Sequence, residues 1–168
     1  MSKHWRIRPH DPDELARLEK TAGVPPVVAQ LLVNRGITDE PEVARFLEAP
    51  MKELRDPELL PGVNEAADLV MAAISSGKRI TIYGDYDADG MTGTAILLRC
   101  LKMLQANVGS YLPNRMTEGY GLNSERLEKL AAEGTELVIS VDCGIASVEE
   151  AARAKELGLE LIITDHHR

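Results

Sequence analysis

The second half of the chain alternates short apolar runs with longer segments that have apolar residues at helical spacing. Runs rich in β-branched and aliphatic residues predict strands at 79–83, 108–112, 136–141 and 159–164. Helical periodicity predicts helices at 64–77, 92–106, 124–133 and 147–158. This alternation favours an α/β fold, a parallel sheet with helices on both faces. The strand runs are apolar throughout, as expected for strands covered on both faces.

The first 60 residues have a different pattern, in which short helical stretches are separated by prolines. Pro25 and Pro26 open one predicted helix, and a second short helix ends before Pro50. We therefore expect residues 1–60 to form a small helical segment that precedes an α/β domain at residues 61–168. The residues of the first segment indicate no chemistry.

Composition narrows the classes of function. The chain has 168 residues, of which 44% are hydrophobic and 4% aromatic, so we expect either one domain or one domain with a small appendage, and a mostly aliphatic core. A net charge of −8 provides no basic surface for nucleic acid, although bound cations would offset acidic clusters. We find no membrane-spanning run and no signal peptide, and we expect a cytoplasmic protein.

The two cysteines lack the spacing of a metal site. Cys100 lies in an apolar run and is predicted to be a core residue. Cys143 follows Asp142 directly, and a nucleophilic thiol is the less favoured of its two interpretations.

The segment TIYGDYDADGMTGT, residues 81–94, places Asp85, Asp87 and Asp89 at alternate positions. An EF-hand calcium loop would need glutamate where this chain has Ile96, and a helix where it has a predicted strand. The calcium interpretation therefore fails. Three carboxylates this close repel one another unless cations neutralise them, so the segment predicts a metal site of another kind.

Three of the predicted strands are followed by carboxylate or imidazole side chains. The first leads to the aspartates of 85–89, the third to Asp142, and the last to Asp165, His166 and His167. Because ligands of an open parallel sheet bind beyond the carboxyl ends of its strands, we expect these side chains to meet. Oxygen and imidazole ligands favour Mn²⁺ or Mg²⁺ over structural zinc. Two such ions bridged by one carboxylate can activate a water molecule and neutralise the oxygens of a phosphate under attack. Free amides at the start of the next helix, at Gly90–Thr94, would suit a phosphate.

Other phosphate-binding motifs fit less well. The chain has no P-loop, and Gly119 and Gly121 do not open a helix directly after a strand. Aspartyl-phosphate phosphatases require threonine or valine two residues after the second aspartate of their motif. Whether that aspartate is taken as Asp87 or Asp89, the residue there, Asp89 or Met91, does not fit.

Taken together, the motifs resemble those of the DHH phosphoesterase superfamily. The residues that carry the likeness are Asp87, Asp89, Asp142 and the run Asp165, His166 and His167. The stretches IYGDYDADGMTGTAIL, LPNRMTEGYGL, VDCGI and ITDHH, with LLVNRGI and VARFLEAP before them, are similar to its single-strand-specific exonucleases. The resemblance covers nearly the whole chain. It implies metal-dependent hydrolysis of single-stranded DNA from the 5′ end, in recombination and repair.

The resemblance also implies individual roles. The metal ligands would be Asp87, Asp89, Asp142 as the bridge, and His166, with Asp85 as a further ligand or a neighbour of the ligands. The phosphate would be contacted by His167 and by Arg115, whose guanidinium matches it bidentately. Asp165 would orient the imidazoles. The cofactors would be Mn²⁺ or Mg²⁺, as two ions in the complete protein.

The resemblance further implies an aspartate ligand, a second domain and a nucleic-acid-binding fold beyond Arg168. We therefore expect residues 1–168 to be an N-terminal fragment that binds metal weakly and hydrolyses DNA poorly. Two alternatives remain: a superfamily member that cleaves short oligonucleotides, cyclic dinucleotides or pyrophosphate, and a non-catalytic replication scaffold. A scaffold would lack acidic ligands, yet none of those expected here is missing. A dimer through an exposed sheet edge is a further option, and the oligomeric state is open.

Overall fold

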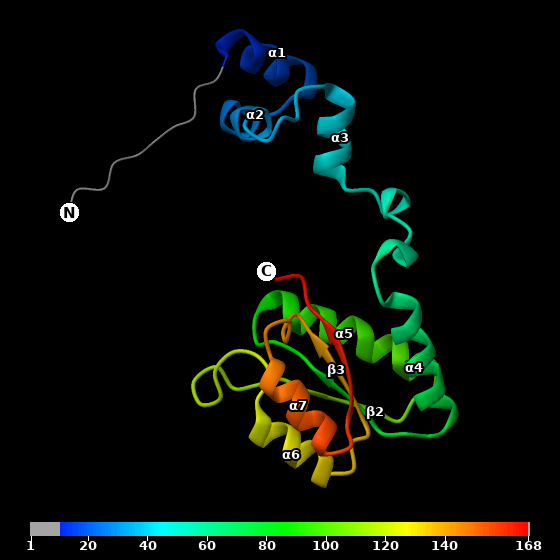
Figure 1. Cartoon of the computed structure of the whole chain (residues 1–168). Coiled ribbons are helices and arrows are strands. Elements are labelled where there is room, and N and C mark those ends of the chain that lie inside the picture. The colour runs from blue at the N-terminus through cyan, green and yellow to red at the C-terminus, as the bar shows by residue number, and fades with distance from the viewer. Residues whose placement is uncertain (1–10, 168) are drawn as a thin grey trace, which may run out of the picture. The chain divides into compact units, whose positions relative to one another are not determined.

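The structure is a computed structural model that describes residues 11–167 (Figure 1). The chain divides into two compact units, one ending at Leu59 and the other beginning at Leu60. No helix within residues 11–167 is long and apolar enough to cross a membrane.

The first unit is helical. It contains α1 (Pro12–Ala22), α2 (Pro26–Val33), α3 (Glu40–Glu48) and the 3₁₀ turns Met51–Glu53 and Pro57–Leu59. Asp11 and Asp39 cap α1 and α3, because their carboxylates accept hydrogen bonds from amides of the first turn. The three α-helices enclose a small core of aliphatic side chains: Leu15, Leu18, Ala29, Leu32, Ile37 and Val43.

The second unit contains a four-stranded sheet in the order β2-β1-β3-β4, with every neighbouring pair parallel. The strands are β1 (Ile80–Tyr83), β2 (Val108–Tyr111), β3 (Leu137–Val141) and β4 (Glu160–Thr164). This confirms the predicted α/β fold with a parallel sheet. The central strands β1 and β3 are buried, whereas the outer strands β2 and β4 are only partly covered.

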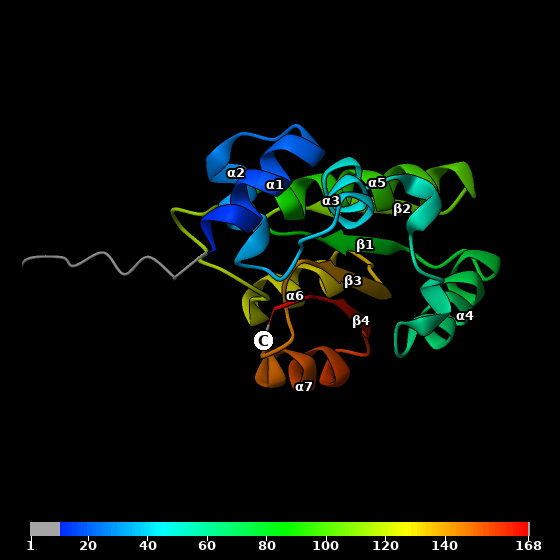
Figure 2. The ribbon, with the colours of Figure 1, turned by 90° about the horizontal axis from the view of Figure 1, so that it is seen from above.

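Helices pack on both faces of the sheet. They are α4 (Val63–Ser75), α5 (Ala88–Met103), α6 (Ser124–Ala132) and α7 (Val148–Glu156). Successive strand side chains point to opposite faces. Ile80 and Ile82 pack with α4 and α5, whereas Tyr83 and Val138 pack with α6 and α7. Figure 2 shows α5 on one side of the sheet and α7 on the other.

The strand order places a crevice between β1 and β3. From β1 the chain crosses through α5 to β2 on one side, and then through α6 to β3 on the other. Ligands of doubly wound sheets bind where the order reverses in this way, beyond the carboxyl ends of the strands. The fold thus directs attention to the residues that follow β1 and β3.

Helix α5 departs from the sequence prediction in two respects. It begins at Ala88 rather than near Thr92, because Asp87 caps it. The apolar side chains of this helix are not all buried: Ile96 is 71% exposed and Met103 84% exposed. Cys100, predicted to be a core residue, is exposed as well. Within the second unit, one side of α5 faces the sheet and the other side carries these exposed residues.

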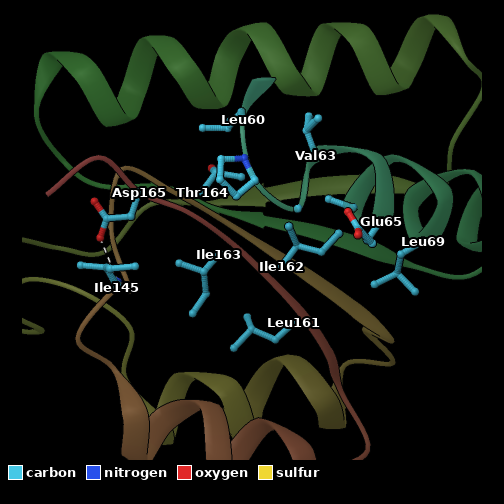
Figure 3. A pocket seen from close by; sticks show the side chains of 13 residues that line it. Leu60, Val63, Glu65, Leu69, Ile145, Leu161, Ile162, Ile163, Thr164 and Asp165 are labelled. Atoms are coloured by element: carbon cyan, nitrogen blue, oxygen red, sulfur yellow. Dashed lines mark hydrogen bonds between the residues drawn. The ribbon is translucent and has the colours of Figure 1, made fainter. Parts of the chain in front are cut away.

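The outer edge of β4 pairs with no strand in the described part of the chain. A hollow of about 550 Å³ runs along it, between β4 and the start of α4 (Figure 3). Its lining is mainly aliphatic, with Leu60, Leu161 and Ile163 among the side chains, and Asp165 lies at one end. The Asp165 end of this hollow lies at the carboxyl end of β4.

Candidate metal centre

The segment after β1 buries one carboxylate and uses another as a helix cap. Asp87 Oδ1 accepts hydrogen bonds from the amides of Asp89 (2.9 Å) and Gly90 (3.0 Å). The first turn of α5 then lies directly on Asp85: a Cβ at Gly90 would fall 2.7 Å from the Asp85 amide nitrogen. This contact leaves Asp85 only 2% exposed. The two amides bound to Asp87 are not free, so our expectation of free amides for a phosphate at this helix start was wrong there.

The turn after β3 places Asp142 in an unusual backbone conformation. Asp142 has φ +64°, in the left-handed region that costs energy for any residue with a Cβ. Its amide donates to the carbonyl of Thr164 (2.8 Å), the last residue of β4. The side chain is only 7% exposed. The pairing of β3 with β4 therefore extends into the turn and holds Asp142 at the edge of the sheet.

The turn after β4 is organised by Asp165, whose side chain is 1% exposed. Its carboxylate accepts from the amide of Ile145 (2.9 Å) and from the amide and ring Nδ1 of His167 (3.0 and 2.7 Å). Burial raises the pKa of Asp165, but these hydrogen bonds outweigh it and lower the pKa overall. The hydrogen bond to Asp165 also raises the pKa of His167. Asp165 thus holds the His167 ring, and its expected role in orienting both imidazoles stays a prediction.

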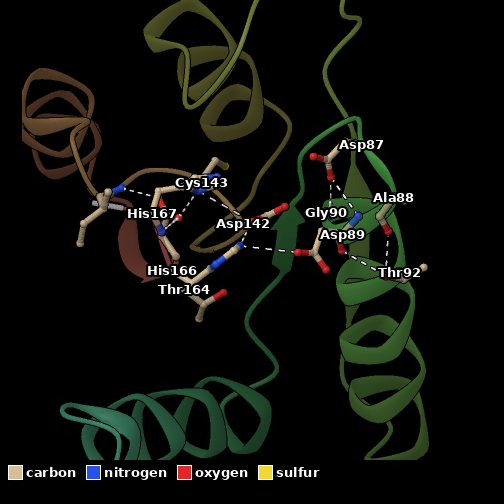
Figure 4. A network of polar contacts seen from close by, with 12 residues as sticks. Asp87, Ala88, Asp89, Gly90, Thr92, Asp142, Cys143, Thr164, His166 and His167 are labelled. Atoms are coloured by element: carbon tan, nitrogen blue, oxygen red, sulfur yellow. Dashed lines mark hydrogen bonds and ion pairs between the residues drawn. The ribbon is translucent and has the colours of Figure 1, made fainter. Parts of the chain in front are cut away.

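The three strand ends converge (Figure 4). His166 Nε2 lies 2.9 Å from Asp142 Oδ1 and 3.5 Å from Asp89 Oδ2. Potential ligand atoms gather in two groups, each within 4.8 Å: Asp142 with His166 and His167, and Asp142 with Asp85 and Asp87. We call these five residues, with Asp89, the rim. The residues that we expected to meet do meet, and Asp142 belongs to both groups.

The rim fits a divalent cation. Asp85 Oδ1 and Asp142 Oδ1 are buried and receive no hydrogen bond from the described residues, although His166 Nε2 lies 2.9 Å from Asp142 Oδ1. A buried carboxylate oxygen without a donor is costly unless a cation compensates it. Burial raises the pKa of Asp85, and the charges of Asp87 and Asp142 raise it further. A cation would relieve both the desolvation and the repulsion.

A hollow of about 330 Å³ opens beside the rim. Asp89, Asp142, Thr164 and His166 line it, so a ligand in this space would contact Asp142, the residue that the two groups share.

Two residues of the loop between β2 and α6, residues 112–123, lie near the rim. Arg115, the predicted phosphate ligand, is exposed and its guanidinium carbon lies 5.2 Å from the Tyr86 ring centroid. No described contact joins it to the carboxylates. Tyr120 reaches the rim through its hydroxyl, 3.2 Å from His167 Nδ1.

Two further side chains change the sequence-based picture. Cys143 is 1% exposed, and burial raises the pKa of its thiol to about 12, so a nucleophilic role is excluded. Thr94 was not predicted to matter, yet its hydroxyl is buried without a hydrogen-bond partner. A Cβ at Gly84 would lie 2.1 Å from that oxygen, so glycine there lets α5 approach β1.

The comparisons with known proteins agree with this geometry. Residues 79–168 match the family model described as the DHH family, N-terminal domain. The chain belongs to the DHH family. Its resemblance to that family in sequence is thereby confirmed, and the match begins one residue before β1 and includes every rim residue.

Within the DHH family, the chain is similar to the single-stranded-DNA-specific exonuclease RecJ of Bacillus subtilis, at 45% identity over 97% of this chain. A solved structure, exonuclease RecJ bound to manganese, shares 49% identity over 66% of this chain and 29% of its own, with a TM-score of 0.61. RecJ from Thermus thermophilus in complex with Mn²⁺ shares 35% identity over 95% of this chain and 22% of its own, with a TM-score of 0.64. The chain spans about a fifth of the Bacillus subtilis protein, 21% of its length.

Proposed function

We propose that this protein binds divalent cations, Mn²⁺ or Mg²⁺, at the rim and hydrolyses phosphodiester bonds of single-stranded DNA from the 5′ end. The observation that carries the proposal is the Asp142 carboxylate, which two groups of potential ligand atoms share at the strand-order reversal. The names of the RecJ relatives support the substrate, and the titles of their manganese-bound structures support the metal.

Four residues would hold the cations: Asp87, Asp89, Asp142 and His166. Asp142 would bridge two ions, since its oxygens lie within reach of both groups, and Asp85 would complete the group with Asp87. Two bound ions supply a water activated for attack and neutralise charge on the phosphate oxygens. The acidic rim of this chain would otherwise repel the DNA backbone.

Other residues would act on the DNA itself. His167 is held by Asp165 through Nδ1, which raises its pKa and so favours the protonated ring that donates a hydrogen bond to the phosphate. Arg115 would supply a second positive group from the 112–123 loop. The turn after β4 and the 112–123 loop would thus bind the substrate, while the rim carboxylates hold the metal.

Metal binding is the first test. We expect Mn²⁺, measured by electron paramagnetic resonance titration, to bind the chain and to lose at least about a hundredfold in affinity in Asp142→Asn, since even groups behind metal ligands contribute tenfold or more. Asp68→Asn, which neutralises an exposed carboxylate on α4, is the matched control. Equal affinity in both variants would refute the proposed centre.

Hydrolysis is the second test, with protein in excess over DNA so that slow cleavage is measurable. We expect release of mononucleotides from the 5′ end of a single-stranded oligonucleotide with Mn²⁺, none in Asp142→Asn, and none from a blunt duplex. Cleavage of dinucleotides alone would favour a small-substrate phosphoesterase. Metal binding without any cleavage would refute the proposed hydrolysis by this chain.

A further inference from the structure

Tyr120 connects the 112–123 loop to the ends of two strands. Its hydroxyl donates a hydrogen bond to the carbonyl of Asp142 (3.2 Å) and lies 3.2 Å from Nδ1 of His167. The Tyr120 and His167 rings meet edge to face, with centroids 5.9 Å apart. One phenol thus touches the residue after β3 and the histidine that follows β4.

The protons at this junction can be assigned consistently. The Tyr120 hydroxyl has one proton, which goes to the Asp142 carbonyl, so its oxygen can only accept from His167 Nδ1. Asp165 Oδ1, 2.7 Å from the same nitrogen, is also only an acceptor. Nδ1 therefore carries the proton and shares it between two oxygens. No described residue contacts Nε2, which leaves that nitrogen available to a ligand.

The same hydroxyl supports the strained turn at Asp142. A non-glycine residue at φ +64° persists only when its surroundings hold it. The amide of Asp142 is held by Thr164, and its carbonyl by Tyr120. The peptide groups that aim the shared carboxylate are therefore fixed on both sides.

The position of Tyr120 is fixed by the residues around it. Tyr83, at the end of β1, donates a hydrogen bond from its hydroxyl to the carbonyl of Gly121 (3.2 Å). The Tyr86 ring lies edge to face with Tyr120, at 6.5 Å between centroids. The ring is nevertheless 54% exposed, so its contacts at the rim, more than its burial, define its role.

We propose that Tyr120 is a positioning residue for the hydrolysis proposed above, on which this inference rests. Together with Asp165, its hydroxyl holds the His167 ring through Nδ1 so that Nε2 faces the phosphate, and it fixes the backbone of Asp142. Tyr120 acts through these two residues and touches no reacting atom. The role belongs to the hydroxyl group, so phenylalanine cannot replace it.

A test that needs no catalysis is the nitrogen-15 NMR spectrum of the histidine rings in the metal-free chain, at a pH where they are neutral. In the wild type we expect His167 as the Nδ1–H tautomer. In Tyr120→Phe the Nδ1 resonance of His167 should shift, because its N–H then bonds to Asp165 alone, while His166 stays unchanged. The control is Tyr111→Phe, which removes the β2 hydroxyl that bonds to Glu118 of the 112–123 loop. It should leave the His167 shifts unchanged. Identical His167 shifts in wild type and Tyr120→Phe would overturn the proposal.

Kinetics separate positioning from DNA binding. Loss of one hydrogen bond predicts that kcat falls roughly tenfold in Tyr120→Phe with KM for the oligonucleotide unchanged. A Tyr120→Phe protein that matches the wild type, with Tyr120→Ala raising KM alone, would assign the ring to base stacking and refute positioning. A wild type that hydrolyses no DNA would refute the proposed function, and the NMR result would still decide the role of the hydroxyl.

Discussion

The rim has two halves that are built by different means. One half, Asp85, Asp87 and Asp89, comes from a single segment whose shape is set by a helix cap and by the contact of Gly90 with Asp85. The other half, Asp142, His166 and His167, comes from two strands and depends on their pairing and on Asp165. The first is encoded locally and the second by topology.

The difference teaches where each half is vulnerable. The local half should fail when the first turn of α5 is disturbed, even if the sheet is intact. The assembled half should fail when the β3 and β4 turns separate, even if α5 is intact. Asp142 lies where the halves meet, so its loss should affect both.

The largest effect is expected at that junction. Asp142→Gly removes the shared carboxylate and should reduce Mn²⁺ affinity by at least about a hundredfold. It should also raise the free energy of unfolding by about 1 kcal/mol, because glycine adopts a positive φ without strain. Titration calorimetry and urea denaturation of the metal-free chain measure the two quantities. A less stable variant would show that the Asp142 side chain contributes more to folding than its strained backbone costs.

Gly90→Ala should break the local half. Alanine usually stabilises a helix, but here its Cβ would lie 2.7 Å from the Asp85 amide nitrogen, so we expect overpacking to cost about 2 kcal/mol. Chemical denaturation measures the cost. Gly109→Ala in β2, whose Cβ would meet no atom within 4 Å, is the control and should be nearly neutral. Equal stability of the two variants would contradict the tight contact.

Asp165→Asn should loosen the assembled half while leaving the local half in place. The amide replaces a charged acceptor of three hydrogen bonds, so we expect Mn²⁺ affinity to fall about tenfold. The melting temperature should fall as well. An unchanged affinity would mean that the histidines hold their positions without this carboxylate.

The smallest expected effect is a difference in stability that separates the two roles of Asp87, as the cap of α5 and as a metal ligand. Asp87→Ser keeps a capping oxygen, whereas Asp87→Ala removes it, so their free energies of unfolding should differ by about 1 kcal/mol. Both variants lose the carboxylate and should bind Mn²⁺ equally weakly. Stronger binding by the serine variant would indicate that the cap, and not the charge, governs the metal affinity.

Much of this molecule was predictable because its signals are local. Apolar runs fix the strands, and the carboxyl-end rule then brings Asp87, Asp142 and His166 together without further information. The sequence prediction placed the start of α5 too late. An aspartate at position 87 is equally typical of a metal ligand and of a residue that caps a helix.

The remaining features depend on three-dimensional neighbours. The exposure of Ile96 and Cys100 is decided by which elements cover α5, and sequence periodicity contains no such information. The reach of the Tyr120 hydroxyl depends on the path of an irregular loop. To predict that Asp142 belongs to both groups of potential metal ligands, one would need the directions of the side chains as well as the order of the strands.

The pairing of Val141 with Thr164 limits where residues can be inserted or deleted in related sequences. A shift of β4 by one residue would place Asp165 opposite Val141 and turn each side chain of the strand to the other face. His167 would then take the place of His166, and the buried carboxylate would lie outside. Insertions between α7 and β4, at the far end of the strands, leave this alignment intact. A single residue gained or lost between Glu160 and His166 would destroy the centre.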